Sequence, residues 1–146
     1  MRKFILGAVG AAMMLAAAPA AAQELPLVPG DYWDVSGITI DDGHFGDYAD
    51  FLAADFRKES EFAKSKGWIK GYHILSNVNA REGEPDIYLV RVYDHVPTTV
   101  EDLQREKEMN AYMSQSTRAA MAASGHRATF RHVKSNEMLQ ELNWAH

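Results

Sequence analysis

Hydrophobic and polar positions follow two different periods along the chain, and these periods predict strands and helices. Residues 32–40 are rich in aromatic and β-branched side chains, which predicts a first strand. From Phe45 onwards, apolar side chains recur at intervals of three and four positions, with charged residues between them. This spacing predicts an amphipathic helix, for which Gly67 is the expected stop.

Two more strand-like runs follow, over residues 68–78 and 86–93. The segment between them, residues 79–85, contains a glycine and a proline. These turn residues predict a hairpin loop, so we expect the two runs to pair antiparallel.

A second helix is predicted after Pro97, with Thr98 or Thr99 as the capping hydroxyl. Residues 114–117 either break this helix or lie within it, and Gly125 is its expected end.

The end of the chain predicts a last strand. Residues 127–133 form a fourth strand-like run, and residues 138–144 either continue it after a bend or add a fifth. The order of elements is therefore β-α-β-β-α-β. This order predicts an α+β, ferredoxin-like domain with a four-stranded antiparallel sheet.

The central strands of this predicted sheet have no polar face. In such a domain the helices cover one face of the sheet, and the other face is polar where it meets water. Here residues 87–93 are apolar at both odd and even positions except for Arg91, and residues 68–75 also place large apolar groups on both sides. Soluble proteins avoid exposing such a patch outside interfaces. We therefore expect a homodimer in which two copies pair their sheets face to face.

With this element order and these two-faced strands, the chain from Tyr32 to Trp144 resembles the dimeric α/β-barrel superfamily. In that superfamily two ferredoxin-like protomers pair their sheets into a closed barrel. The resemblance implies a pocket between the sheet and the helices. Its members include cofactor-independent oxygenases, lactone isomerases, haem-degrading and haem-binding enzymes, and proteins without known chemistry, so the resemblance carries no catalytic pattern over to particular residues.

The N-terminus has the order of a cleavable secretory signal, residues 1–22. Two basic residues precede an apolar run of about 15 residues, and small residues follow it up to Ala22. The apolar run is shorter than the roughly 20 residues that span a bilayer, so we expect no stable membrane anchor. We expect cleavage near Ala22, a periplasmic or secreted location, an extended arm over residues 23–31 and one domain over residues 32–146.

Composition excludes several classes of function. Loss of the two basic residues of the signal takes the formal net charge from −5 to −7, and basic residues are not clustered, which argues against a nucleic-acid partner. The chain has no cysteine, so thiol chemistry and thiolate metal sites are excluded. The six histidines show no metal-ligand spacing, so we expect no metal.

Two histidines are candidate catalytic residues. His44 stands at the loop before the first helix, and His73 stands in the middle of a strand. Either one is a candidate general base, or a single axial ligand if haem binds. The alternative for both is a structural role in the core or at the interface.

Arg91 is the most unusual residue of the predicted core, because a guanidinium within an apolar strand needs a partner. That partner is either an acid on the first helix, such as Asp55 or Glu59, or a carboxylate or phenolate on a ligand. Candidate ligand-binding residues beside it are aromatic and are able to line a pocket for a flat organic molecule: Tyr72, Tyr93 and Trp68.

These observations predict a secreted, dimeric barrel protein that binds a small aromatic or apolar organic molecule without a cofactor. If it is an enzyme, the resemblance implies a cofactor-independent monooxygenase or isomerase. The alternatives are a non-catalytic structural or interaction protein, and a haem-binding barrel. The sequence leaves open whether the protein is an enzyme and which molecule it binds.

Overall fold

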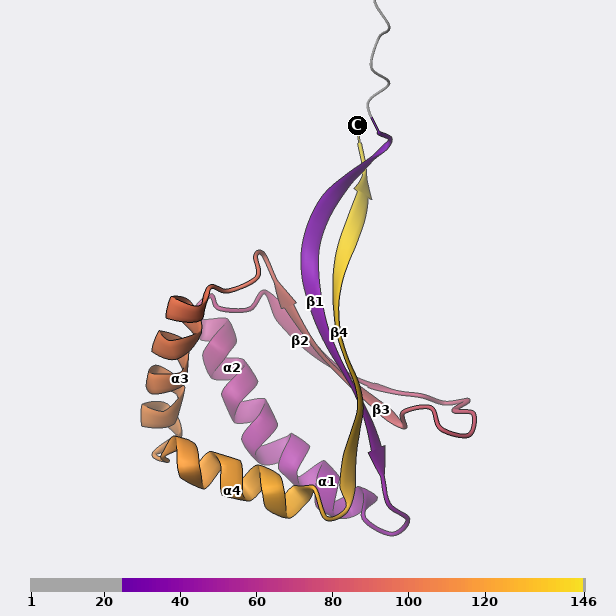
Figure 1. Cartoon of the computed structure of the whole chain (residues 1–146), viewed down its shortest axis with the longest axis vertical. Coiled ribbons are helices and arrows are strands. Elements are labelled where there is room, and N and C mark those ends of the chain that lie inside the picture. The colour runs from indigo at the N-terminus through magenta and orange to yellow at the C-terminus, as the bar shows by residue number, and fades with distance from the viewer. Residues whose placement is uncertain (1–24, 146) are drawn as a thin grey trace, which may run out of the picture.

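The computed structural model describes residues 25–145. The predicted signal peptide and His146 lie outside the described residues. The elements, in chain order, are β1 (Leu27–Ile40), α1 (Phe45–Phe51), the π-helical turn η1 (Leu52–Phe56), α2 (Arg57–Ser65), β2 (Gly71–Ser76), β3 (Ile87–Tyr93), α3 (Thr99–Met113), α4 (Thr117–Arg127) and β4 (Arg131–Trp144) (Figure 1).

The strands form one antiparallel sheet of four strands in the order β2-β3-β1-β4. The helices lie together on one side of this sheet (Figure 1). The chain is therefore an α+β domain, and its element order and strand order are compatible with the predicted ferredoxin-like fold.

Strand β1 begins at Leu27, five residues earlier than the aromatic run predicts. The pairing of β1 with β4 continues through a register shift between Pro29 and Tyr32, where Gly30 leaves no room for a Cβ beside Asn143. Part of the predicted extended arm is thus a strand. The β1–β4 ribbon extends beyond the two shorter strands (Figure 1).

Strand β4 is also a single long strand, because its pairing with β1 runs from Arg131 to Trp144. A register shift opposite Gly37 and Ile38 takes up Lys134. The sequence left this open, since the polar residues around position 135 interrupt the alternation. Backbone pairing to β1 decides it in favour of one bulged strand.

The first predicted helix is present, with a π-helical turn in its middle. Its buried residues Tyr48, Leu52, Phe56 and Ser60 lie four positions apart. In a regular α-helix a four-residue spacing drifts around the axis, because one turn takes 3.6 residues. The wider π turn η1 corrects this drift, so all four side chains face the sheet side.

The second predicted helix is divided into α3 and α4. Ser114 adopts the left-handed conformation with φ of 54°, and Ser116 then caps α4 by accepting a hydrogen bond from the backbone N–H of Ala119. At the other end of α3, Thr98 and Glu101 form a reciprocal capping box.

The core lies between the helices and the sheet. Its cluster of buried side chains joins β1, α1, η1, β3 and the residue before β4: Ile38, Tyr48, Leu52, Phe56, Ile87 and Phe130.

The opposite side of the sheet, which we call the open face, is largely apolar, although the register also places His73, Ser135 and Glu137 on it. Strand register places on it the side chains of Trp33, Val35, Leu75, Tyr88, Val90, Val92 and Leu139. Val90 is only 1% exposed, because the rings of Trp33 and His73 stack across β3 with their centroids 6.1 Å apart. Leu75 and Leu139, which flank this stack, are about half exposed. Within residues 25–145 no helix packs on the open face (Figure 1).

Candidate functional site

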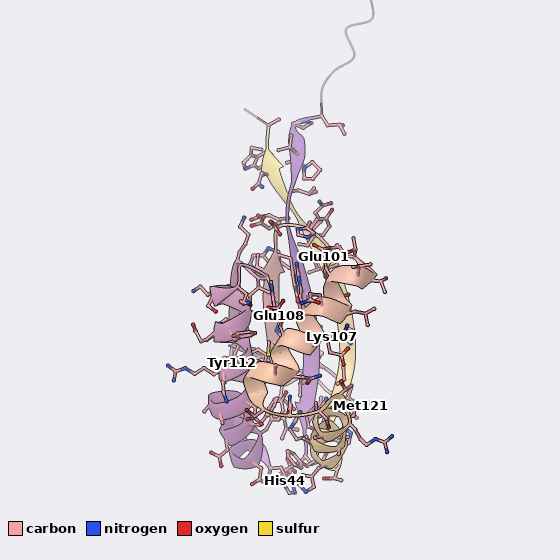
Figure 2. The ribbon with its side chains drawn as sticks, turned by 90° about the vertical axis from the view of Figure 1, so that its left-hand side faces the viewer. His44, Glu101, Lys107, Glu108, Tyr112 and Met121 are labelled. Atoms are coloured by element: carbon pink, nitrogen blue, oxygen red, sulfur yellow. The ribbon has the colours of Figure 1, made fainter. Side chains whose placement is uncertain are left out.

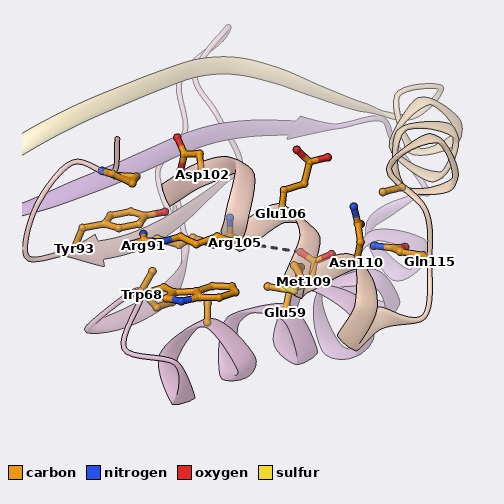
Figure 3. Close-up of a pocket in the computed structure, with 14 residues that line it drawn as sticks. Glu59, Trp68, Arg91, Tyr93, Asp102, Arg105, Glu106, Met109, Asn110 and Gln115 are labelled. Atoms are coloured by element: carbon orange, nitrogen blue, oxygen red, sulfur yellow. Dashed lines mark ion pairs between the residues drawn. The ribbon is translucent and has the colours of Figure 1, made fainter. Parts of the chain in front are cut away.

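A cavity of about 330 Å³ lies between β3 and α3, on the helix side of the sheet (Figure 3). Residues from both elements, from α2 and from the α2–β2 connection line it, and α4 closes one end. The lining includes Glu59, Trp68, Arg91, Tyr93, Arg105 and Met109.

The apolar part of the wall is formed largely by aromatic side chains and a methionine. Trp68 and Tyr93 present aromatic side chains to the cavity, and Met109 adds a flexible thioether from α3 (Figure 3). Such walls suit a flat organic group, because aromatic faces gain contact area and a methionine adapts to irregular shapes.

Arg91 reaches into this cavity from the middle of β3. One of its terminal nitrogens lies 3.7 Å from a carboxylate oxygen of Glu59. At this distance the two groups form an ion pair, but they are too far apart for a hydrogen bond. The Nε of Arg91 is buried and has no hydrogen-bond partner among the described residues. Its guanidinium carbon also lies 5.3 Å from the ring centroid of Phe56.

Arg105 enters the cavity from α3, and the sequence did not single it out. Its side chain is only 18% exposed and its Nη2 lies 3.8 Å from an oxygen of Glu101. Glu101 accepts hydrogen bonds from Thr98 and from His95, and its distance of 3.8 Å from Arg105 is too long for a further one. The guanidinium carbon lies 5.9 Å from the centroid of the Trp68 ring.

Burial changes the acidity of two groups that line the cavity. Loss of solvent raises the pKa of Glu59, and the positive charge of Arg91 opposes this rise only in part. Burial also raises the pKa of the Tyr93 phenol, against the opposing charges of Arg91 and Arg105. The cavity therefore favours a protonated Tyr93, which is able to donate a hydrogen bond.

Contacts with α2 hold α3 over the cavity. Tyr112 stacks on Phe62 with ring centroids 4.1 Å apart, and Glu108 forms an ion pair with Lys66 at 2.7 Å. Figure 2 shows Glu108 and Tyr112 on the side of α3 that faces α2. No residue of α3 is fully buried, so surface contacts rather than a core hold this wall of the cavity.

The structure separates the two candidate histidines from each other and from the cavity. His44 lies before α1, where its Nδ1 is 2.8 Å from a carboxylate oxygen of Asp47 and its ring stacks on Phe130. His73 lies on the open face against Trp33. Neither is among the residues that line the cavity.

Of the predicted ligand-binding residues, Arg91, Tyr93 and Trp68 meet in the cavity and Tyr72 does not. Tyr72 lies on the same sheet face as its register partner Arg91. Its ring packs against the edge of Phe56, and its hydroxyl donates a hydrogen bond of 2.6 Å to Glu61. The role of Tyr72 in the described structure is thus the packing of η1 and α2 onto β2.

The described lining of the cavity does not fit haem through a histidine ligand, because it contains no histidine. Within residues 25–145 there is also no group of three or more histidine and acidic side chains arranged to hold a metal ion. The groups that the cavity offers to a ligand are guanidinium, carboxyl, phenol and aromatic groups.

Comparison of the sequence with protein-family models gives no match, and a search of curated proteins likewise finds none. Among residues 25–145, no helix has the length and hydropathy needed to cross a membrane.

Proposed function

We propose that this protein binds a small organic molecule with a flat, aromatic or apolar body in the cavity between β3 and α3. The observation that carries the proposal is Arg91, whose Nε is buried without a partner on a cavity wall that Trp68 and Tyr93 share. The guanidinium of Arg91 makes no hydrogen bond within the described residues, so its terminal nitrogens are able to donate to a ligand in the cavity.

A thermal-shift screen of aromatic metabolites tests this proposal. The screen is run on the wild-type protein, on a variant whose cavity is filled by a large side chain, and on a control variant whose added side chain lies outside the cavity. Ala120 lines the cavity from α4, while the neighbouring Ala119 is exposed on the same helix. We expect hits that stabilise the wild-type protein and Ala119→Trp but not Ala120→Trp. Hits that bind all three proteins equally would place the ligand elsewhere, and an empty screen would remove the proposal.

We also propose that the protein is a homodimer whose copies meet through their open faces. Its support is the exposure of Leu75 and Leu139, at 48% and 50%, beside the stacked rings of Trp33 and His73. A second copy would bury these side chains against the same face of its partner, as in the self-complementary interface of a two-fold dimer. The predicted signal peptide supports a periplasmic or secreted location for this dimer.

A second candidate function is catalysis of proton transfer in the same cavity, as in a cofactor-independent isomerase. Its support is Glu59, a carboxyl group on the cavity wall whose pKa is raised by burial. The candidate histidines do not line the cavity, so Glu59 would be the base. Incubation of a screen hit in deuterated water, followed by mass spectrometry, tests it: exchange that Glu59→Gln abolishes would support catalysis, and no exchange would favour binding alone.

A further inference from the structure

The arginine side chains of the cavity have more hydrogen-bond donors than the protein uses. A guanidinium group has five N–H donors. Within residues 25–145 neither the Arg91 side chain nor the Arg105 side chain makes a hydrogen bond, and their ion-pair oxygens on Glu59 and Glu101 lie 3.7 and 3.8 Å away. Both side chains are at most about one-third exposed, at 34% and 18%, so bulk water reaches them only in part.

The two guanidinium groups act on the same region of the cavity. Both line it, from β3 and from α3 respectively, and both exert their charge on the hydroxyl of Tyr93 (Figure 3). That hydroxyl makes no hydrogen bond within the described residues, so it is a further donor beside them.

The acidic groups of the cavity do not take up these donors. Glu106 accepts a hydrogen bond of 2.6 Å from the hydroxyl of Thr117, and Glu101 is occupied by the cap of α3. Asp102 lines the cavity but forms no ion pair with a described residue. Each cavity arginine approaches one acid, Arg91 approaching Glu59 at 3.7 Å and Arg105 approaching Glu101 at 3.8 Å, and neither pair is within hydrogen-bond distance.

We propose that the ligand of this cavity carries an anionic oxygen group, a carboxylate or a phosphate ester, which Arg91 and Arg105 bind together beside the hydroxyl of Tyr93. This inference rests on the proposed function of the cavity and names the chemistry of its ligand. Guanidinium groups match the planar oxygens of carboxylates and phosphates with paired hydrogen bonds, which a lysine does not. The Trp68 ring, 5.9 Å from the Arg105 guanidinium carbon, then contacts the flat body attached to this group.

Nuclear magnetic resonance of the arginine Nε–H groups tests the proposal, because these signals shift when a guanidinium binds an oxygen anion. The probes are benzoate, phenyl phosphate, neutral benzamide of similar shape, and inorganic phosphate. The variants are Arg91→Met and Arg105→Met, with Arg81→Met as the matched control on a loop where that side chain is 87% exposed. Arg91→Lys and Arg105→Lys keep the charge and serve if a methionine variant does not fold.

In the wild-type protein we expect benzoate or phenyl phosphate to bind about 10- to 100-fold more tightly than benzamide. The preference is expected to shrink at least tenfold in Arg91→Met and in Arg105→Met, to be reduced in the lysine variants, and to persist in Arg81→Met. The stronger of the two anions identifies the ligand as a carboxylate or a phosphate ester.

Two results would overturn the inference and leave the cavity as a binding site: equal binding of benzamide and benzoate that Ala120→Trp abolishes, or an anion preference that survives both methionine substitutions. If inorganic phosphate binds as tightly as phenyl phosphate, the aromatic body contributes nothing to binding, and that part of the proposal would be overturned. Failure of every probe, benzamide included, would count against the proposed function itself.

Discussion

The Arg91 guanidinium and the Glu59 carboxylate face each other in the cavity wall at 3.7 Å, close enough to attract but too far apart to share a proton or a hydrogen bond. If the two groups were within hydrogen-bond distance, each would satisfy the other and the pair would have a purely structural role. The observed separation leaves the hydrogen-bonding capacity of both groups available to a third molecule.

Glu59 gives the folded protein a specific pH dependence. Burial raises its pKa above the value of the unfolded chain, so the folded state holds this proton more tightly. The contribution of Glu59 to stability is therefore largest below the unfolded pKa of 4.5 and falls as pH rises from there toward the folded pKa. Urea denaturation between pH 4 and 7 should show this fall in the wild-type protein relative to Glu59→Gln, and no such difference for the exposed Glu82→Gln. A wild-type stability that rises relative to Glu59→Gln over this range would contradict the assignment.

An acidic residue on the open face should dissociate the proposed dimer. Leu139 lies opposite Trp33 on β1, and Leu139→Asp would place a charge in the interface without a partner. Leu103, about as exposed on α3, is the control site for Leu103→Asp. Sedimentation at low micromolar concentration should give twice the chain mass for the wild type and Leu103→Asp, and the single mass for Leu139→Asp. A wild-type protein that sediments as one chain would refute the dimer.

The capping box should contribute measurably to the stability of α3. Thr98→Ala removes the side-chain acceptor for the backbone N–H of Glu101, which typically costs about 1 kcal/mol. Thr99 is the first residue of the helix and is not its cap, so Thr99→Ala should change the free energy of unfolding much less. Chemical denaturation measures both, and equal effects would show that the cap lies elsewhere.

The link between α3 and α4 should tolerate glycine better than serine. Ser114 is the one described non-glycine residue with positive φ, at 54°. Ser114→Gly relieves this strain, but glycine also raises the conformational entropy of the unfolded chain, which opposes the gain. We expect the free energy of unfolding to rise by about 0.5 kcal/mol. Ser116→Gly, at the N-cap of α4, should instead destabilise slightly. A destabilised Ser114→Gly would argue for one continuous helix.

The order of the elements could be predicted from the sequence because it depends on local signals. The periodicity after Phe45, the stop at Gly67 and the turn residues before Asp86 each act within a few positions. The full lengths of β1 and β4 could not be predicted, since Pro29 and Gly30 break the alternation and only pairing with a distant strand extends it. The even four-residue spacing of the buried residues from Tyr48 to Ser60 indicates the π turn. The sequence instead suggested an ordinary helix, because its apolar residues recur at both three- and four-residue intervals.

The candidate site was predictable only in part. The charge of Arg91 stands out in an apolar strand, but Arg105 lies in a charged helix where an arginine normally faces water. Only the docking of α3 over the cavity shows its role. Tyr72 and His73 are adjacent in β2 and so point to opposite faces of the sheet, but the sequence does not say which face the helices cover.

The position of a bound ligand tests the account most directly. A hit from the thermal-shift screen should show nuclear Overhauser contacts from its aromatic protons to the methyl group of Met109 and to the ring of Trp68, which both line the cavity. Contacts instead to Trp33 and Leu139 would place the ligand on the open face and contradict the assignment of the cavity.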